Sequence, residues 1–145
     1  MAVTSSRTVS IAAPVETVAA TARDVGGHRE WWPGMLVSEV LERDVEGRCT
    51  LARIVDEVAK VGRDEFRLAY THEDGSVSWH LVGRSRLQKS QAGSIRFRSL
   101  GEGSEATVAL AIETTLPLPG FLQRQVVRGV DRGAAEGLRA RCEGR

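Results

Sequence analysis

"GRDEFRLAYTHEDGSVSWHLVGRSRL", residues 62–87, is the stretch that decides the fold of this chain. Apolar and polar residues alternate in its first half, which is typical of a β-strand with one buried face. Asp74 and Gly75 form a dipeptide that strongly favours a tight hairpin turn, and the alternation resumes after it. The stretch therefore predicts an antiparallel strand pair. Its inward side chains are expected to be Phe66, Leu68, Tyr70, His72, Val77, Trp79 and Leu81.

The same patterns, read outward from this hairpin, predict the remaining elements. Alternation predicts further strands, apolar residues at helical spacing predict helices, and the short spacers between strands imply antiparallel pairing. This order predicts one α+β domain over residues 1–145, in which a curved antiparallel sheet of six to seven strands wraps around a long C-terminal helix. The expected strands are 7–11, 35–43, 48–58, 62–73, 76–87, 93–100 and 105–116, and the expected helices are 14–25, a turn at 28–33, and 119–141.

Three glycines of the last predicted helix, Gly129, Gly133 and Gly137, recur every fourth residue and so share one face. Each costs a helix interior ~1 kcal/mol relative to alanine. Either the helix backbone lies close on the sheet there, or it stands off and leaves room for a ligand. We expect the second arrangement. A membrane dimerisation motif is excluded because the helix also carries several charged residues, among them Arg128 and Asp131.

The composition is that of an ordinary soluble protein, with 41% hydrophobic and 27% charged residues and a net charge of +1. It gives no indication of a nucleic-acid partner, because the arginines are scattered along the chain. Neither a signal peptide nor a membrane-spanning segment is apparent, and two cysteines without metal or redox spacing, Cys49 and Cys142, suggest reduced thiols. We expect a cytoplasmic protein. Eighteen arginines against two lysines, with no asparagine, suggest a GC-rich bacterial genome.

Motifs of catalysis and cofactor binding are absent from the sequence. The three histidines, His28, His72 and His80, have no metal-ligand spacing, and there is neither HExxH nor GxSxG. "GEGSEA", residues 101–106, loosely matches a dinucleotide motif but precedes a strand instead of opening a helix. We therefore expect no metal and no cofactor.

Three stretches resemble a known family. "IAAPVETVAATARDVGGHREWWPGM" (11–35) is similar to the first strand and helix pair of polyketide cyclase-like and coenzyme Q-binding-like proteins in the START-related superfamily. "GSVSWHLVG" (75–83) resembles a central strand of the bacterial branch, and "LPLPGFLQRQ" (116–125) resembles the start of its C-terminal helix. The resemblance covers essentially the whole chain. It implies a helix-grip fold with a hydrophobic cavity between the sheet and the C-terminal helix.

The inward aromatic residues, and the turn that the resemblance places near the cavity mouth, supply the candidate ligand contacts. Tyr70 is the best polar candidate because a buried hydroxyl needs a hydrogen-bond partner, and Ser85 is a second. At most one of the two adjacent tryptophans is expected to line the cavity, and Asp64 and His72 are expected to reach solvent at strand ends. The candidate set is Trp31, Trp32, Phe66, Tyr70, Trp79, Leu81, Phe97, Leu110, Val126, Gly129, Val130 and Gly133.

Three functions remain open at this point. The first is binding or transport of a small hydrophobic ligand: a lipid, a polyketide or an isoprenoid quinone. The second is an aromatase/cyclase-type enzyme, which would need His72, Tyr70 or Arg53 to point into the cavity. The third is a protein-interaction module, which predicts a filled core, whereas a cavity above ~300 Å³ would favour ligand binding. The oligomeric state is not indicated by the sequence.

Overall fold

The computed structural model describes residues 2–58 and 61–145. Its seven strands form one antiparallel sheet in the order β1-β7-β6-β5-β4-β3-β2. The elements are β1 (Val3–Ile11), α1 (Val15–Arg23), the 3₁₀ helix η1 (Val25–Glu30), β2 (Met35–Arg43), β3 (Cys49–Val58), β4 (Gly62–Glu73), β5 (Ser76–Leu81), β6 (Gln88–Leu100), β7 (Gly103–Thr114) and α2 (Gly120–Cys142).

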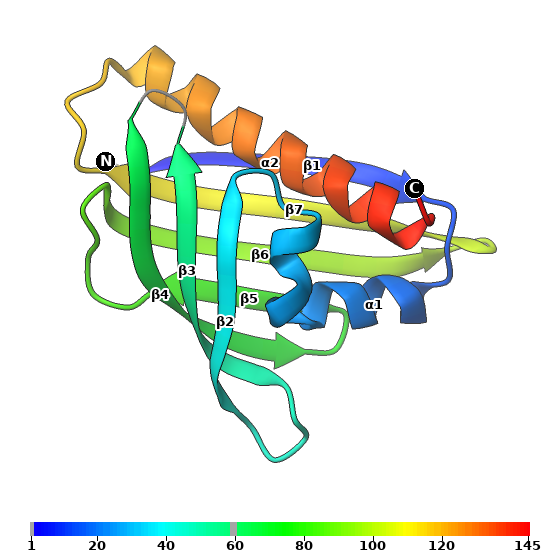
Figure 1. The fold of residues 1–145 in the computed structure, drawn as a ribbon. Coiled ribbons are helices and arrows are strands. Elements are labelled where there is room, and N and C mark those ends of the chain that lie inside the picture. The colour runs from blue at the N-terminus through cyan, green and yellow to red at the C-terminus, as the bar shows by residue number, and fades with distance from the viewer. Residues whose placement is uncertain (1, 59–60) are drawn as a thin grey trace.

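The sheet is strongly bent. Figure 1 shows β2–β4 turned across β5–β7, with α2 running along the open side of the resulting cup. The helices α1 and η1 lie toward the C-terminal end of α2 and close that end of the cup. This arrangement confirms the expected helix-grip architecture.

The central hairpin follows the expected register. Tyr70 pairs with Trp79, Leu68 pairs with Leu81, and Gly75 at the turn has a φ of +74°. The side chains of Phe66, Leu68 and Tyr70 are buried, while those of the residues between them on the strand are more exposed. Alternation alone therefore predicted this part of the sheet.

Several element ends differ from the expectation. Strand β5 stops at Leu81 instead of continuing to Leu87, and β6 begins at Gln88, five residues earlier than expected. Between them Gly83 adopts a φ of +71°, which bends the chain away from the extended conformation. Helix α1 ends at Arg23, three residues before Gly26, so the two glycines lie inside η1 instead of stopping α1.

Helix α2 packs on the sheet mainly through its C-terminal half. Val127, Ala134, Ala135 and Leu138 are buried, whereas Val126 keeps 48% of its surface exposed. The N-terminal half contributes fewer buried residues. This uneven packing leaves space under the first turns of α2.

The glycine face of α2 does not line that space, which corrects our expectation for Gly129 and Gly133. A Cβ added at Gly137 would overlap the backbone carbonyl of Trp31, and one at Gly133 would lie 3.2 Å from Cγ of Pro33. A Cβ at Gly129 would meet nothing within 4 Å. On its glycine face the helix backbone thus lies close to the Trp31–Pro33 turn, and two of the glycines permit that approach.

Candidate functional site

A cavity of about 190 Å³ lies between the sheet and the first half of α2. Strands β3, β4, β6 and β7 form its walls, together with Trp79 of β5 and residues of η1 and α2. The cavity is mostly apolar. Six of the lining residues that keep contact with solvent mark its rim: Val58, Val61, Leu116, Leu118, Gln123 and Val126.

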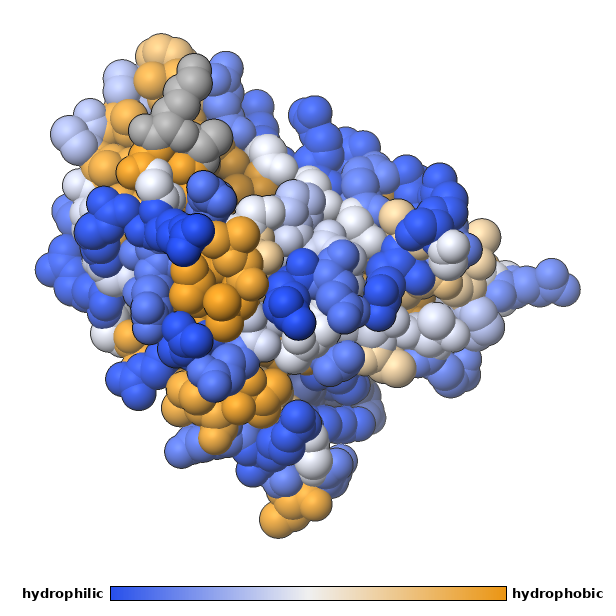
Figure 2. Space-filling view, viewed as in Figure 1, coloured by the Kyte–Doolittle hydropathy of each residue, from blue (hydrophilic) through white to orange (hydrophobic). Residues whose placement is uncertain are grey.

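Apolar side chains gather around this rim on the molecular surface. Figure 2 shows them at the end of the molecule where α2 begins. Phe121 on the first turn of α2 is 57% exposed, and Val126 is among the other exposed large apolar residues. The rim is therefore an apolar opening and not a charged one.

Seven of the twelve candidate contacts line the cavity, and they come from the three strands β4, β5 and β7, from α2 and from the turn after η1. Trp32 enters the wall and Trp31 does not, as expected for adjacent residues. A role in ligand binding stays a prediction for all of them. The seven are Trp32, Phe66, Tyr70, Trp79, Leu110, Val126 and Val130.

The other five candidates lie outside the cavity. Trp31 packs beneath α2 at Gly137, and Phe97 is covered by the guanidinium of Arg23, which sits 5.3 Å from the ring centroid. Leu81, the last residue of β5, is buried in the core opposite Leu68. Gly129 faces open space, and Gly133 faces Pro33, as described above. An inward-facing position therefore does not suffice to reach the cavity.

An aromatic cluster forms the inner end of the cavity. Trp32 and Trp79 meet edge to face, with ring centroids 5.8 Å apart, and Tyr70 lies 5.9 Å from Trp79. The imidazole of His28 lies 6.5 Å from Tyr70 and 6.1 Å from Trp32. Aromatic pairs at these distances stabilise one another beyond their burial, so this wall is rigid.

His28, which sequence reasoning missed, is 1% exposed and lines the cavity. Its Nε2–H donates to the carbonyl oxygen of Ala22 at 2.8 Å, because a carbonyl can only accept. Burial lowers the pKa of His28 to about 4, against the opposing effects of the Ala22 carbonyl and Asp24. The ring is therefore neutral at pH 7, and its Nδ1 carries a lone pair. No donor to that nitrogen exists in residues 2–58 and 61–145.

The hydroxyl of Tyr70 is also unpartnered. The side chain is 6% exposed and lines the cavity, and its hydroxyl makes no hydrogen bond with any residue that the structure describes. Burial raises the pKa of Tyr70 well above its usual value, with smaller contributions from Cys49 and Asp56. The hydroxyl keeps its proton and can donate it to a ligand atom.

Asp64 anchors a polar wall near the rim. It is 2% exposed, so the expectation that it reaches solvent is wrong. Oδ2 accepts from the Ser85 hydroxyl at 2.6 Å and from Gln88 Nε2 at 3.2 Å, and Oδ1 accepts from the Leu87 amide at 3.3 Å. These donors come from residues 85–88, at the junction between β5 and β6, which lie against the start of β4. Ser85 is thus held by Asp64 and does not line the cavity.

The wall continues inward through two glutamines. Gln91 Nε2 donates to Gln88 Oε1 at 2.6 Å, and Trp79 Nε1 donates to Gln91 Oε1 at 2.9 Å. A continuous hydrogen-bonded chain therefore runs from Asp64 to the aromatic cluster. It fixes the Trp79 ring, which lies so close to Gly93 that a Cβ there would overlap it.

Asp56 lies directly opposite Asp64 on β3 and lines the same cavity. Its Oδ1 is buried and has no hydrogen-bond partner among the described residues. Burial, with a smaller contribution from the Asp64 charge, raises the pKa of Asp56 to about 7. Sequence reasoning missed Asp56 because β3 alternates poorly. The hairpin register that places it against Asp64 was the available signal.

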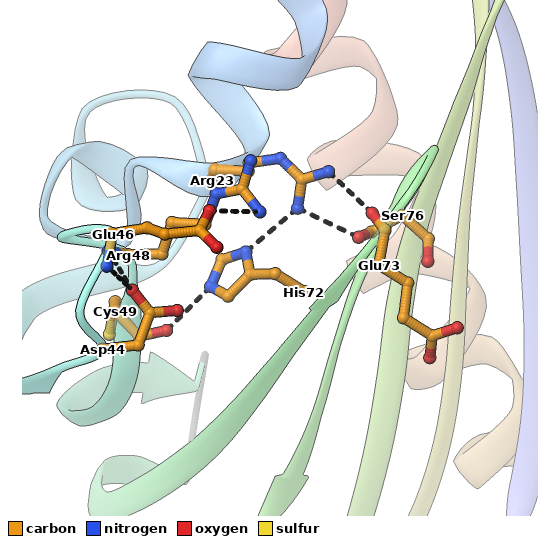
Figure 3. A network of polar contacts seen from close by, with 8 residues as sticks. All are labelled: Arg23, Asp44, Glu46, Arg48, Cys49, His72, Glu73 and Ser76. Atoms are coloured by element: carbon orange, nitrogen blue, oxygen red, sulfur yellow. Dashed lines mark hydrogen bonds and ion pairs between the residues drawn. The ribbon is translucent and has the colours of Figure 1, made fainter.

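His72 belongs to a separate cluster at the C-terminal end of α1, where Arg23 lies near the β2–β3 and β4–β5 turns, as shown in Figure 3. Arg23 Nη1 donates to His72 Nδ1 at 3.0 Å, and His72 Nε2 donates to the Cys49 carbonyl at 2.8 Å. Arg23 also donates to the carbonyl oxygens of Glu73 and Ser76. The cluster ties α1 to the β4–β5 turn and leaves His72 away from the cavity.

Arg53 also points away from the cavity, since it pairs with Glu39 and Glu65 on the outer face of the sheet. Of the three residues considered for an enzyme, only Tyr70 reaches the cavity. Within the described residues no group of three or more His, Cys, Asp or Glu could hold a metal ion. No helix there is both long and apolar enough to cross a membrane.

The sequence profile of the polyketide cyclase/dehydrase and lipid transport family matches residues 2–143. The chain belongs to this family. No curated protein matches the chain.

Solved structures show how widely the family fold is shared. A START superfamily protein from Mycobacterium smegmatis is 23% identical, with a TM-score of 0.89 over 97% of each chain. The ZhuI aromatase/cyclase from Streptomyces sp. R1128 is 16% identical, with a TM-score of 0.81 over 99% of this chain and 94% of that one. A protein from Thermus thermophilus is 22% identical, with a TM-score of 0.75 over 99% of this chain and 98% of that one. These similarities establish the fold alone.

Proposed function

We propose that this family member binds a small hydrophobic ligand, such as a lipid, a polyketide or an isoprenoid quinone, in the cavity between the sheet and α2. The observation that carries the proposal is an aromatic-lined cavity whose wall also holds Tyr70, with no hydrogen bond from its hydroxyl to the described residues, and the buried, unpartnered Oδ1 of Asp56. Buried polar groups without partners are costly, and a ligand that pairs with them removes that cost. Cytoplasmic location is part of the proposal, supported by the unpaired Cys49 and Cys142.

The volume limits what the cavity encloses. Ligand cavities commonly span ~300–1,000 Å³, and at about 190 Å³ this one lies below the value that we set for favouring ligand binding. The enclosed part of the ligand is therefore small, and the rest extends over the apolar rim near Val58 and Val126. An unfilled cavity still supports ligand binding over the interaction module, which predicts a filled core.

Native mass spectrometry of the purified protein, followed by organic extraction, tests the proposal. The extracted protein is then offered 1-decanol, 2-naphthol and a ubiquinone with one isoprenoid unit. The matched variants are Val130→Trp, which fills the cavity from α2, and Arg128→Trp, which adds the same ring on the exposed side of the helix. We expect copurification or uptake in the parent and in Arg128→Trp only. Absence of any apolar ligand from the parent, or uptake unchanged in Val130→Trp, would contradict the proposal.

An aromatase/cyclase-type enzyme is the second candidate. One observation favours it: a carboxyl group with a pKa of about 7, that of Asp56, lines the same cavity as the protonated Tyr70 hydroxyl. Such a pair can exchange protons with a bound carbonyl compound near neutral pH. Turnover of a polyketide substrate that is lost in Asp56→Asn and in Tyr70→Phe would establish it. Polyketide synthase genes beside this gene would favour the enzyme over the carrier.

A further inference from the structure

The charge of the cavity wall is one-sided. Among the described lining residues, the ionisable side chains are Asp56, Asp64, His28 and Tyr70, and none is a lysine or arginine. His28 and Tyr70 are uncharged at neutral pH for the reasons given above. Above pH 7, where the Asp56 carboxyl with its pKa of about 7 is ionised, the wall therefore carries only negative charge.

The rim end presents acceptors to a ligand. Asp64 already uses its carboxylate for Ser85, Gln88 and the Leu87 amide. The facing Oδ1 of Asp56 is buried without any donor among the described residues. A ligand atom that donates a hydrogen bond would satisfy this oxygen, whereas an anionic group would add a third negative centre to a poorly solvated site.

The inner end also presents an acceptor. The ring of His28 lines the cavity, and its Nδ1, the nitrogen that is not bonded to the Ala22 carbonyl, accepts no hydrogen bond from the described residues. The Tyr70 ring lies 6.5 Å from the His28 ring, measured between centroids, and the Tyr70 hydroxyl can donate or accept. A ligand hydroxyl can donate to His28 Nδ1, but a carboxylate or phosphate oxygen has no proton to give to it.

An apolar stretch separates the two ends. Asp64 and Tyr70 are six residues apart on β4, so they lie on the same face of the strand. Phe66 and Leu68 face the cavity between them. A ligand that fits both ends therefore has an apolar body and a polar group that donates.

We infer that the cavity selects neutral or cationic apolar ligands that carry a hydrogen-bond donor, such as alcohols, phenols and amines, and rejects carboxylates and phosphate esters of the same size. The inference rests on the proposed function and defines the chemical class of its ligand. Fatty acids and phospholipid head groups are excluded from the enclosed space, although their chains have the right polarity.

Three probes with the same chain test the inference: 1-decanol, decylamine and decanoate. Their binding is measured at pH 8 by titration calorimetry and by tryptophan fluorescence, since Trp32 and Trp79 form part of the wall. We expect decanol and decylamine to bind and decanoate to bind at least tenfold more weakly. Decanoate that binds as tightly as decanol would overturn the inference and leave the proposed function intact.

The variant Asp56→Asn removes one negative group from the cavity, and Glu57→Gln removes one from the exposed neighbouring position on β3. We expect Asp56→Asn to lower the ratio of decanol affinity to decanoate affinity and to weaken the binding of decylamine. We expect Glu57→Gln to change neither the ratio nor the decylamine affinity. Equal ratios in the parent and Asp56→Asn, or failure of decylamine alone to bind the parent, would overturn the assignment of the acidic end. Failure of all three probes to bind would contradict the proposed function itself.

Discussion

Gly137 of α2 packs directly against the backbone carbonyl of Trp31, leaving no room for a Cβ between the helix and the turn after η1. This contact positions the Trp31–Trp32 pair. With Trp31 fixed beneath the helix, the ring of the next residue, Trp32, turns into the cavity wall. A glycine in a helix interior, unfavourable for the helix by itself, thus serves the architecture of the site.

Replacing Gly137 with alanine is expected to destabilise the protein by about 1–3 kcal/mol, because the added methyl group overlaps a backbone carbonyl that cannot rotate away. Gly129→Ala is the matched control. Its Cβ meets nothing within 4 Å, so the higher helix propensity of alanine should stabilise the protein by ~1 kcal/mol. Urea unfolding of both variants measures the difference. Equal effects of the two substitutions would contradict the close packing at Trp31.

The close packing of α2 on the Trp31–Pro33 turn also determines the expected outcome of Gly133→Leu. A helix face that lined the cavity would tolerate leucine and lose only ligand uptake. A Cβ at Gly133 instead lies 3.2 Å from Pro33, so the leucine side chain must displace that turn. We expect a loss of stability measurable in thermal unfolding. Parent-like stability together with reduced ligand uptake would restore the interpretation of this face as a cavity wall.

The Asp56 carboxyl makes stability fall as pH rises. Its pKa is raised to about 7 in the folded protein from about 4 in the unfolded chain, so the folded state binds the proton more tightly. The free energy of unfolding should therefore decrease between pH 4 and pH 7, by less than ~4 kcal/mol because cavity water screens the charge. Urea unfolding across this range should show a flatter profile in Asp56→Asn than in Glu57→Gln. Parallel profiles would show that Asp56 titrates normally.

His28 produces the opposite slope. Burial lowers the pKa of His28 from 6.5 to about 4. Between these two pH values the imidazole is protonated in the unfolded chain and neutral in the folded protein. The contribution of the neutral His28 to stability is complete above pH 6.5 and is lost as the pH falls from 6.5 to about 4. His28→Gln should reduce this acid dependence, although the variant is less stable overall. The exposed His80→Gln should leave the profile unchanged, and an equal effect of both substitutions would rule out the buried neutral imidazole.

Tyr70→Phe separates binding from folding. The hydroxyl has no partner among the described residues, so its removal should change stability by less than about 0.5 kcal/mol. Calorimetric titration with 1-decanol should nevertheless show affinity reduced about fivefold to tenfold, the usual worth of one buried hydrogen bond. A large loss of stability with unchanged affinity would mean that the hydroxyl serves the fold and not the ligand.

The sequence predicted the sheet well because alternation along a strand reports which side chains face inward. It could not predict which inward side chains reach the cavity. Phe97 and Trp79 both face inward, but Arg23 of α1 covers Phe97, and only the three-dimensional path of α1 reveals this. Asp56 was missed because its strand alternates poorly, and its importance depends on the register with Asp64. His28 is placed by a short 3₁₀ helix, for which the sequence holds no periodic signal.

The central claim is that the space between the sheet and the first half of α2 is where the ligand binds. Isotope-edited NMR of the protein with 1-decanol tests it most directly, by detecting which methyl groups lie near the ligand chain. We predict contacts to Ile54, Leu68, Leu110 and Val130, which line the cavity from β3, β4, β7 and α2. Contacts confined to exposed apolar residues such as Leu41 and Val45, with none to those four, would contradict the account.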